Sequence, residues 1–402
     1  MVVKNSFIYL GAEILNKAIP FLLLPIITKY LTPQEYGIYG IYQVLLSFLT
    51  PFLSMSLDIN ITRNFFKVSK EKLSTILSSL ISILHLNLFL GLITVYIISL
   101  FFENPFGVPN KILMIMPIII FAQTMNTFNL TILRNEQKAM RYGFFQIILT
   151  IINFSSTLLL LLVFHKNWES LVYGILIAHV ILMLYTLYCL KNEYKLSFNF
   201  YSFKEIYKIS LSLIFHLLGG SIIFLSDRLF IQQMEGLKEV GLYSIGNQFG
   251  VITMIVLNAI IMAINPWMYK KLADKINIKR EIYLLMFFFS CIGLVVWQSS
   301  LVVFPYVVDS KYHEAKQVIV WISMAFVFRG WYQLYYNVVL DAGKTIVFMY
   351  ITFGSGILNL ILNYILIKQN GMVGASQATV IAFFTMYISL SIYSKKINLG
   401  KK

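Results

Sequence analysis

The residues of this sequence most able to do chemistry are charged side chains that lie inside long apolar stretches. Three cations have this position: Lys17, Arg228 and Arg329. Two acids share the same stretches, Glu13 and Asp227. An ionisable group at mid-membrane depth costs about 2.5 to 3.5 kcal/mol on insertion scales, so each one is expected to face a cavity or a partner. The sequence therefore predicts a polar interior within an apolar molecule.

The richest candidate binding surface surrounds Arg329. Tyr332, Gln333, Tyr336 and Asn337 follow it at helical spacing, and these positions occupy about 140° of arc on an α-helix. A sugar phosphate needs positive charge for its phosphate and hydrogen-bonding groups for its hydroxyls, and this set supplies both. The alternative is an aromatic packing seam from which the guanidinium of Arg329 extends to a polar edge.

A second polar stripe contains Asp227. His216 precedes it by eleven residues, which is three helical turns, and lies on the same face. Both are candidates for coupling to an ion, H⁺ or Na⁺, since burial can bring a carboxyl group into the range where it titrates. Arg228 projects about 100° away from Asp227 and addresses a different neighbour. The alternative is that the Asp and the Arg only tie helices together.

The first apolar stretch carries Glu13, Asn16 and Lys17 on one face. Asn16 and Lys17 are candidate binding residues, and Glu13 is a candidate for ion coupling. Glu13 and Lys17 are four residues apart, so mutual neutralisation is the alternative.

Asparagines recur along another helical face, at Asn247, Asn258 and Asn265. We take Asn247 and Asn258 as candidate substrate-binding residues. Such amides also join helices to one another, at about 0.6 kcal/mol each, which is the simpler interpretation of any single one.

These side chains must be positioned by membrane-spanning helices. The 402 residues are 58% hydrophobic and only 12% charged, about half the charge of an ordinary soluble domain. Apolar runs near 20 residues long, sufficient to cross about 30 Å of hydrocarbon, recur between short polar breaks. We predict an all-α polytopic protein with twelve transmembrane helices, at residues 6–29, 36–60, 73–101, 112–133, 143–164, 171–190, 206–233, 241–268, 282–305, 316–341, 346–367 and 373–393.

The distribution of Lys and Arg predicts the orientation. If the loops alternate between two sides, one side and its termini hold 22 of these residues and the other holds seven. Short cytoplasmic loops are rich in Lys and Arg, so both termini are expected in the cytoplasm. The formal charge of +15 then reflects topology and attraction to anionic membrane lipids, and no nucleic-acid partner is expected.

A short internal repeat predicts two related halves. Glu35, Gly37, Tyr39 and Ile41 recur 204 residues later, as Glu239, Gly241, Tyr243 and Ile245. Pseudo-symmetric halves commonly enclose a central site in transporters. We predict an N-terminal lobe over 1–190, a cytoplasmic linker over 191–204 and a C-terminal lobe over 205–402.

No sequence pattern indicates an enzyme. The chain has no phosphate-binding G-x-x-x-x-G-K-[ST] motif and no H-E-x-x-H or G-x-S-x-G motif. Its two cysteines, Cys189 and Cys291, do not suggest a disulfide framework or a metal site. We expect a transporter that has no metal and no cofactor beyond a coupling ion.

Five stretches resemble the Wzx-type polysaccharide flippases, in the superfamily that also contains the multidrug-exporting MATE antiporters and the lipid II flippase. They span most of the chain: FLLLPIITKYLTPQEYGIYG at 21–40, SDRLFI at 226–231, VGLYSIGNQFG at 240–250, NPWMYKKL at 265–272 and GMVGASQAT at 371–379. The resemblance implies two six-helix lobes around a central cavity. It also implies transfer of undecaprenyl-diphosphate-linked oligosaccharide, an O-antigen, capsule or exopolysaccharide unit, to the outer leaflet of a bacterial cytoplasmic membrane.

The resemblance also assigns roles and partners. It implies that Arg228, and less directly Lys17, bind the diphosphate, and that a polysaccharide polymerase and glycosyltransferases are partners. The several arginines expected in the first helices of a lipid II flippase are not matched, because the first stretch offers only Lys17. A multidrug antiporter and a non-transporting partner of a glycosyltransferase remain alternatives.

Overall fold

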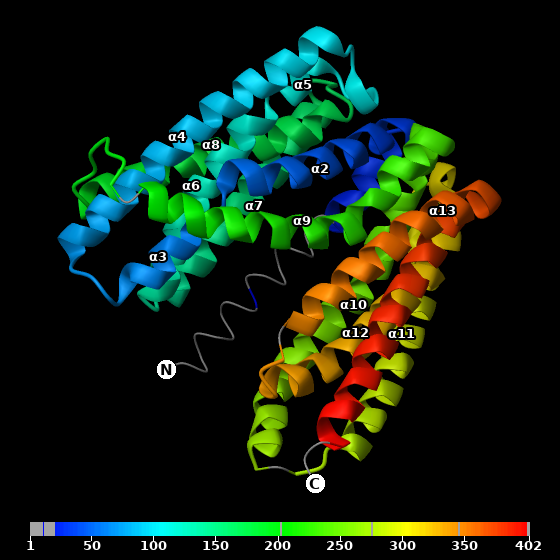
Figure 1. Ribbon diagram of the computed structural model, residues 1–402. Helices are drawn as coiled ribbons and strands as arrows, with labels where there is room; N and C mark the ends of the chain where they lie inside the picture. Colours follow the sequence, from blue (N-terminus) through cyan, green and yellow to red (C-terminus); the bar gives the residue numbers. More distant parts are fainter. Residues whose placement is uncertain (1–10, 12–20, 202, 275, 345, 400–402) are drawn as a thin grey trace. The chain divides into compact units, whose positions relative to one another are not determined.

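The computed structural model describes residues 11, 21–201, 203–274, 276–344 and 346–399. Every regular element in these ranges is a helix (Figure 1). After a short apolar helix, Phe21–Tyr30, the elements follow in this order. They are α2 (Pro33–Ser54), α3 (Asp58–Phe65), α4 (Lys70–Phe101), η1 (Pro105–Gly107), α5 (Asn110–Leu113), α6 (Met116–Asn135), α7 (Ala139–Leu162), α8 (Glu169–Glu193), α9 (Phe203–Met234), α10 (Leu237–Ala273), α11 (Lys279–Val307), η2 (Ser310–Ala315), α12 (Lys316–Asp341) and α13 (Ile346–Leu399).

The prediction of an all-α membrane protein is confirmed. Eight helices in the described ranges are long and apolar enough to cross a membrane. The predicted stretch 316–341 coincides with α12, and 143–164 overlaps α7. The first predicted helix, 6–29, lies mostly outside the described residues. The total of twelve spans stays a prediction.

The described chain forms two compact units. Among the described residues, the first contains those up to 31 and those from 41 to 218, and the second contains 32–40 and those from 219 onward. Two helices are therefore divided: α2 gives its first turns to the second unit, and α9 gives its first half to the first unit.

Helix α6 is the centre of the first unit. It packs against α3, α4, α7 and α8, and its side chains Met125 and Phe128 are fully buried. Its large share of buried positions follows from these neighbours, since a helix surrounded on all sides can be apolar all round.

The linker after α8 lies along α4, held by three serines spaced four residues apart. The hydroxyl of Ser74 donates to the carbonyl oxygen of Lys195 (2.8 Å), Ser78 accepts from the N–H of Ser197 (3.0 Å), and Ser82 accepts from the N–H of Asn199 (3.2 Å). Four helical residues rise about 6 Å and two extended residues about 6.6 Å, so the two spacings match. The sequence predicted this segment as a linker but did not predict that it is bound.

Helix α12 has the corresponding central position in the second unit. It packs against α10, α11 and α13. Helix α11 buries one face, formed by Ile278, Ile282, Met286 and Phe289, at the three- and four-residue spacing of an amphipathic helix. Helix α12 is not among the eight helices of the described chain that are long and apolar enough to cross a membrane, as expected for a helix that carries Arg329, Gln333 and Asn337.

Helix α13 is a hairpin of two helices. Gly371 has φ of 54° and ψ of −139°, a backbone conformation that breaks the helix and is open to glycine. A side chain at Gly374 would overlap the carbonyl oxygen of Leu366, so the second arm begins in close contact with the first. Figure 1 shows the two arms as an orange and a red helix. The predicted break between 367 and 373 falls at this turn.

The two copies of the sequence repeat contact each other reciprocally in the second unit. A side chain at Gly37 would overlap the carbonyl oxygen of Leu237, and one at Gly241 would overlap that of Pro33. Positions 33 and 237, like 37 and 241, differ by the repeat offset of 204. Self-complementary contact of this kind is typical of a two-fold axis, here relating the first turns of α2 and α10.

Candidate functional site

Four of the predicted site residues cannot be located. Glu13, Asn16 and Lys17 lie outside the described residues. His216 belongs to α9, but its side chain is also outside them. The roles predicted for these four stay predictions. The other predicted site residues belong to the second unit.

Asp227 of α9 is the centre of a hydrogen-bond network that joins this helix to three other segments. It is only 2% exposed. Its Oδ2 accepts from the hydroxyls of Tyr243 on α10 (2.6 Å) and Thr379 on the second arm of α13 (2.9 Å), and its Oδ1 accepts from the amide of Asn363 on the first arm (2.7 Å). Each donor stabilises the ionised carboxylate, since a carboxylate only accepts hydrogen bonds. Asp227 therefore holds α9, α10 and both arms of α13 together.

Arg228 shares one neighbour with Asp227, Tyr243, and has another of its own, Ser244. Its Nε donates to the hydroxyl of Ser244 (3.1 Å), and its guanidinium lies 5.7 Å from the ring centre of Tyr243. These two contacts, a hydrogen bond and a cation–π contact, orient the guanidinium. Arg228 is partly exposed.

Arg329 and Asn258, two residues predicted for the site, are brought together by the packing of α10 on α12. The Nη1 of Arg329 donates to the Oδ1 of Asn258 at 3.4 Å. Tyr332, one turn further along α12, is 8% exposed. The pair thus combines a partly exposed cation with an amide where α10 and α12 pack together.

The other residues predicted to share a face of α12 with Arg329 are involved either in packing or in polar contacts. The rings of Tyr336 and Phe348 stack with centres 4.1 Å apart, and Gln333 has a buried Oε1 that accepts no hydrogen bond from a described residue. Asn337 donates to Asn265 (2.7 Å) and accepts from Tyr269 (3.0 Å). The asparagine pair joins α10 to α12.

Asn247, also predicted for the site, is partly buried on α10. The amide of its neighbour Gln248 donates to the hydroxyl of Tyr36 on α2, and Tyr36 packs edge-on against Tyr312 of η2. Burial raises the pKa of Tyr312 above its usual range, so this hydroxyl stays neutral. These contacts belong to Gln248 and not to Asn247, so the binding role of Asn247 stays a prediction.

Three partners of Asp227 were not predicted: Tyr243, Asn363 and Thr379. Tyr243 belongs to the repeat, which identified its position but not its contact. Asn363 lies on an amide-bearing face with Asn359, to which it donates at 3.2 Å. Thr379 gives no signal in sequence, because a threonine hydroxyl usually bonds its own helix, as this one also does with Ala375.

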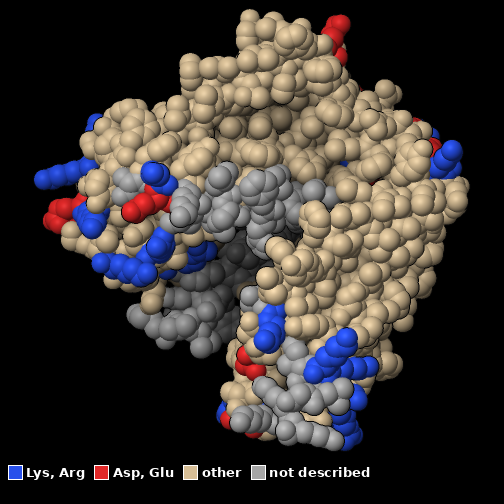
Figure 2. Space-filling model, in the orientation of Figure 1, with Lys and Arg blue, Asp and Glu red and all other residues tan. Residues whose placement is uncertain are grey.

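Charged side chains gather away from the apolar surfaces. Figure 2 shows broad uncharged areas, with Lys and Arg gathered in separate patches. The elements place many basic residues at or near helix ends. Among them are Lys270, Lys271, Lys279 and Arg280, at the junction of α10 and α11. This arrangement is expected where helix ends meet lipid headgroups and water.

Comparison with known proteins places the chain among membrane proteins of polysaccharide synthesis. A family model described as "Polysaccharide biosynthesis protein" matches residues 2–271. An uncharacterized membrane protein of Haemophilus influenzae is 28% identical over 276 residues, which are 67% of this chain and 66% of that protein. The chain thus matches just under two thirds of that relative's length.

Solved structures share the fold. The lipid II flippase MurJ in an inward closed conformation superposes with a TM-score of 0.77 and 17% identity, over 98% of this chain and 87% of that one. An inward-facing MATE family multidrug transporter of the MOP superfamily gives a TM-score of 0.73 and 13% identity, over 95% of each chain. The predicted MATE-like fold is confirmed.

Proposed function

The chain belongs to the family of polysaccharide biosynthesis proteins, and we propose that it is a flippase for lipid-linked oligosaccharide. Its substrate is an undecaprenyl-diphosphate-linked repeat unit of an O-antigen, capsule or exopolysaccharide. It moves this unit from the inner to the outer leaflet of a bacterial cytoplasmic membrane. Glycosyltransferases supply the substrate and a polysaccharide polymerase consumes the product. The lipid tail stays among membrane lipids throughout.

The observation that carries this proposal is the pairing of Arg329 with Asn258 inside the second unit. A guanidinium can bind two phosphate oxygens at once, and the amide and the nearby hydroxyl of Tyr332 are suited to sugar hydroxyls. Arg228, oriented by Ser244 and Tyr243, is the second cation for the diphosphate. Lys17 is the third and is proposed from the sequence.

The mechanism we propose is alternating access of the two lobes. No covalent step is needed, because the substrate changes only its leaflet. An interior-negative potential favours outward movement of negative charge by about 2.3 kcal/mol per charge per 100 mV, so a dianionic diphosphate gains about 4.6 kcal/mol. Entry of H⁺ or Na⁺ through Glu13, Asp227 or His216 is a second driving force that we propose.

The test is transport in proteoliposomes of defined potential, with an undecaprenyl-diphosphate-linked oligosaccharide and an external lectin that captures flipped glycan. We expect Arg329→Ala to reduce the rate by about tenfold or more, because loss of a charged hydrogen bond costs about 1.5 to 3 kcal/mol. Arg329→Lys is expected to retain part of the rate. Lys368→Ala, which removes an exposed cation of the same unit, is the matched control.

Three results contradict the proposal. Wild-type transport by Arg329→Ala together with Arg228→Ala removes the role of the cations. Export of a cationic drug without flipping of the oligosaccharide instead supports the antiporter alternative, which the fold shared with MATE transporters keeps in view. Transport of lipid II, with no transport of the oligosaccharide, supports a lipid II flippase. The structural neighbour MurJ is a flippase of this kind.

A further inference from the structure

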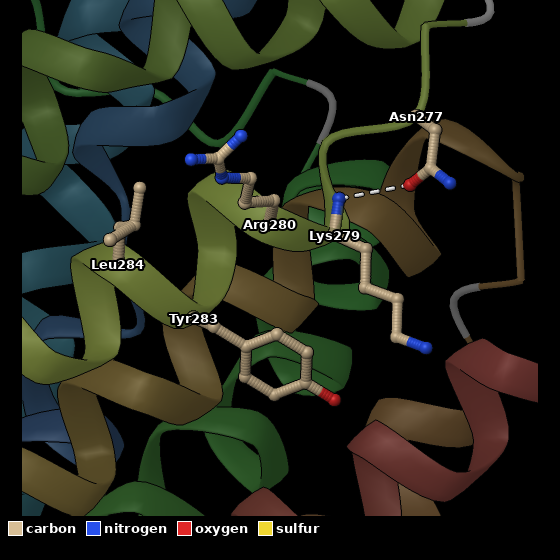
Figure 3. Close-up of a pocket in the computed structure, with 5 residues that line it drawn as sticks. All are labelled: Asn277, Lys279, Arg280, Tyr283 and Leu284. Carbon is tan, nitrogen blue, oxygen red and sulfur yellow. Dashed lines mark hydrogen bonds between the residues drawn. The ribbon is translucent and has the colours of Figure 1, made fainter.

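A surface cavity of about 580 Å³ lies where α10 ends and α11 begins, apart from the candidate site. All five lining residues are exposed: Asn277, Lys279, Arg280, Tyr283 and Leu284. Figure 3 shows Lys279 and Tyr283 projecting to one side of the first turns of α11, and Arg280 and Leu284 to the other side. The cavity is thus bounded by two cations, an amide, a phenol and an apolar side chain.

The two cations keep their charge available. Neither Lys279 nor Arg280 forms an ion pair with any residue of the described chain. The neighbouring acid, Glu281, is paired with Lys271 at 3.3 Å. Asp274, at the end of α10, is exposed and does not line the cavity. The cavity therefore has a net positive charge and favours an anion.

An apolar stripe runs from the cavity along the exposed face of α11. Leu284, Phe287 and Phe288 are 59%, 71% and 51% exposed, and Leu294 and Val295 continue the stripe two turns further on. This face lies opposite the buried one formed by Ile278, Ile282 and Met286. In a membrane-spanning helix such a face contacts lipid chains. A cation pair thus stands at one end of a surface suited to an acyl chain.

We propose that this cavity binds the phosphate of an anionic phospholipid, with an acyl chain along the Leu284 to Val295 face of α11. Lys279 and Arg280 bind the phosphate, and Asn277 and Tyr283 bind headgroup oxygens. The charge of the cavity and its position at the end of a lipid-facing stripe select a membrane phospholipid over a soluble anion. The site is separate from Arg329 and does not depend on the transport proposal.

The test is native mass spectrometry of the purified full chain, titrated with phosphatidylglycerol or phosphatidylcholine. Each cation near an anionic surface changes affinity by about fivefold. We therefore expect Lys279→Ala with Arg280→Ala to weaken phosphatidylglycerol binding about 25-fold and to leave phosphatidylcholine binding unchanged. The matched control is Lys395→Ala with Lys396→Ala, an exposed adjacent cation pair at the end of α13. Thermal unfolding in detergent verifies that both double variants are folded.

The proposal is overturned by any of three results. An equal loss in the control pair means that general surface charge, and not the cavity, attracts the lipid. Displacement of phosphatidylglycerol by inorganic phosphate at equal concentration means a site for a free anion. Preferential binding of undecaprenyl phosphate means an entry site for lipid-linked substrate. Loss confined to the Lys279 and Arg280 variant, without these displacements, supports the phospholipid site.

Discussion

At the scale of single residues, the cost of burying charge explains most of what sequence could predict. Asp227 and Arg228 were identified because an ionised group in an apolar helix requires a partner, and the structure provides partners for both. The partners themselves are serine, threonine, tyrosine and asparagine. These residues are common in membrane helices, so sequence could not indicate which of them lie near Asp227.

The network of Asp227 predicts a measurable structural role. We expect Asp227→Asn to lower the free energy of unfolding by about 1.5 to 3 kcal/mol, because an asparagine amide cannot accept all three hydrogen bonds and places its own donors against donors. The measurement is thermal unfolding in detergent. Asp341→Asn, at an exposed position of the same unit, is the control and should unfold like the wild type.

The same variant separates the two interpretations of Asp227. An ion-coupling carboxylate predicts that Asp227→Asn abolishes the dependence of transport on pH or Na⁺ while stability is retained. A carboxylate that only joins helices predicts lost stability with the ion dependence intact in the folded fraction. Unchanged stability would contradict the structural role given above.

At the scale of helices, apolar length predicted where elements lie but not what their ends contact. The predicted stretches 316–341 and 346–367 correspond to α12 and to the first arm of α13. Apolar length accounts for the arm of α13, whereas α12 has the predicted extent without being among the helices that are apolar enough to cross a membrane. The bound linker was missed. Its hydrogen bonds join Ser74, Ser78 and Ser82 to a segment more than 110 residues away, and serines inside an apolar run usually bond their own helix.

The serine contacts predict protection of the linker from proteases. In Ser78→Ala with Ser82→Ala, the N–H groups of Ser197 and Asn199 lose their acceptors. At about 1 kcal/mol for each hydrogen bond, we expect cleavage by trypsin after Lys195 to become about 30-fold faster where opening limits cleavage. Thr94→Ala, whose hydroxyl bonds only its own helix, is the control. Equal cleavage rates in the two variants would mean that the serines do not hold the linker.

The reciprocal glycine contact between α2 and α10 predicts non-additive destabilisation. Gly37→Ala and Gly241→Ala each place a methyl group against a carbonyl oxygen, and each is expected to cost about 1 to 3 kcal/mol of stability. The double variant should cost less than the sum, because either substitution alone separates the same two helices. Gly354→Ala, where no atom lies within 4 Å, is the control in thermal unfolding measurements. Additive costs would contradict a shared contact.

At the scale of the whole molecule, the repeat predicted a relation between distant segments that neither segment shows alone. Gly37 and Gly241 are ordinary glycines in sequence, and only the offset of 204 connects them. The structure brings them into contact. The limits predicted for the lobes, 1–190 and 205–402, stay predictions, since hydrophobic length does not determine which helices pack together.

The orientation of the molecule in the membrane also follows from a property of the whole chain, the asymmetry of its Lys and Arg residues. The loop after α7 carries only Lys166 between two long helices. On the other side, Lys138 lies in the loop before α7 and Lys195 in the segment after α8, and Arg134 and Lys191 lie in the last turns of α6 and α8. A basic loop remains in the cytoplasm because its transfer across the membrane is disfavoured. We therefore expect residue 166 on the outer side and residue 344, in the loop before α13, on the inner side.

Cysteine labelling in intact cells tests this orientation. In a chain with Cys189→Ser and Cys291→Ser, a membrane-impermeant maleimide should label Lys166→Cys in intact cells, and Lys344→Cys only after the cells are permeabilised. Both positions are exposed, so burial does not limit labelling at either one. The opposite pattern would place the α10–α11 junction, with Lys279 and Arg280, on the outer side. The 22 cations of the predicted cytoplasmic side would then face outward, which would contradict the predicted orientation.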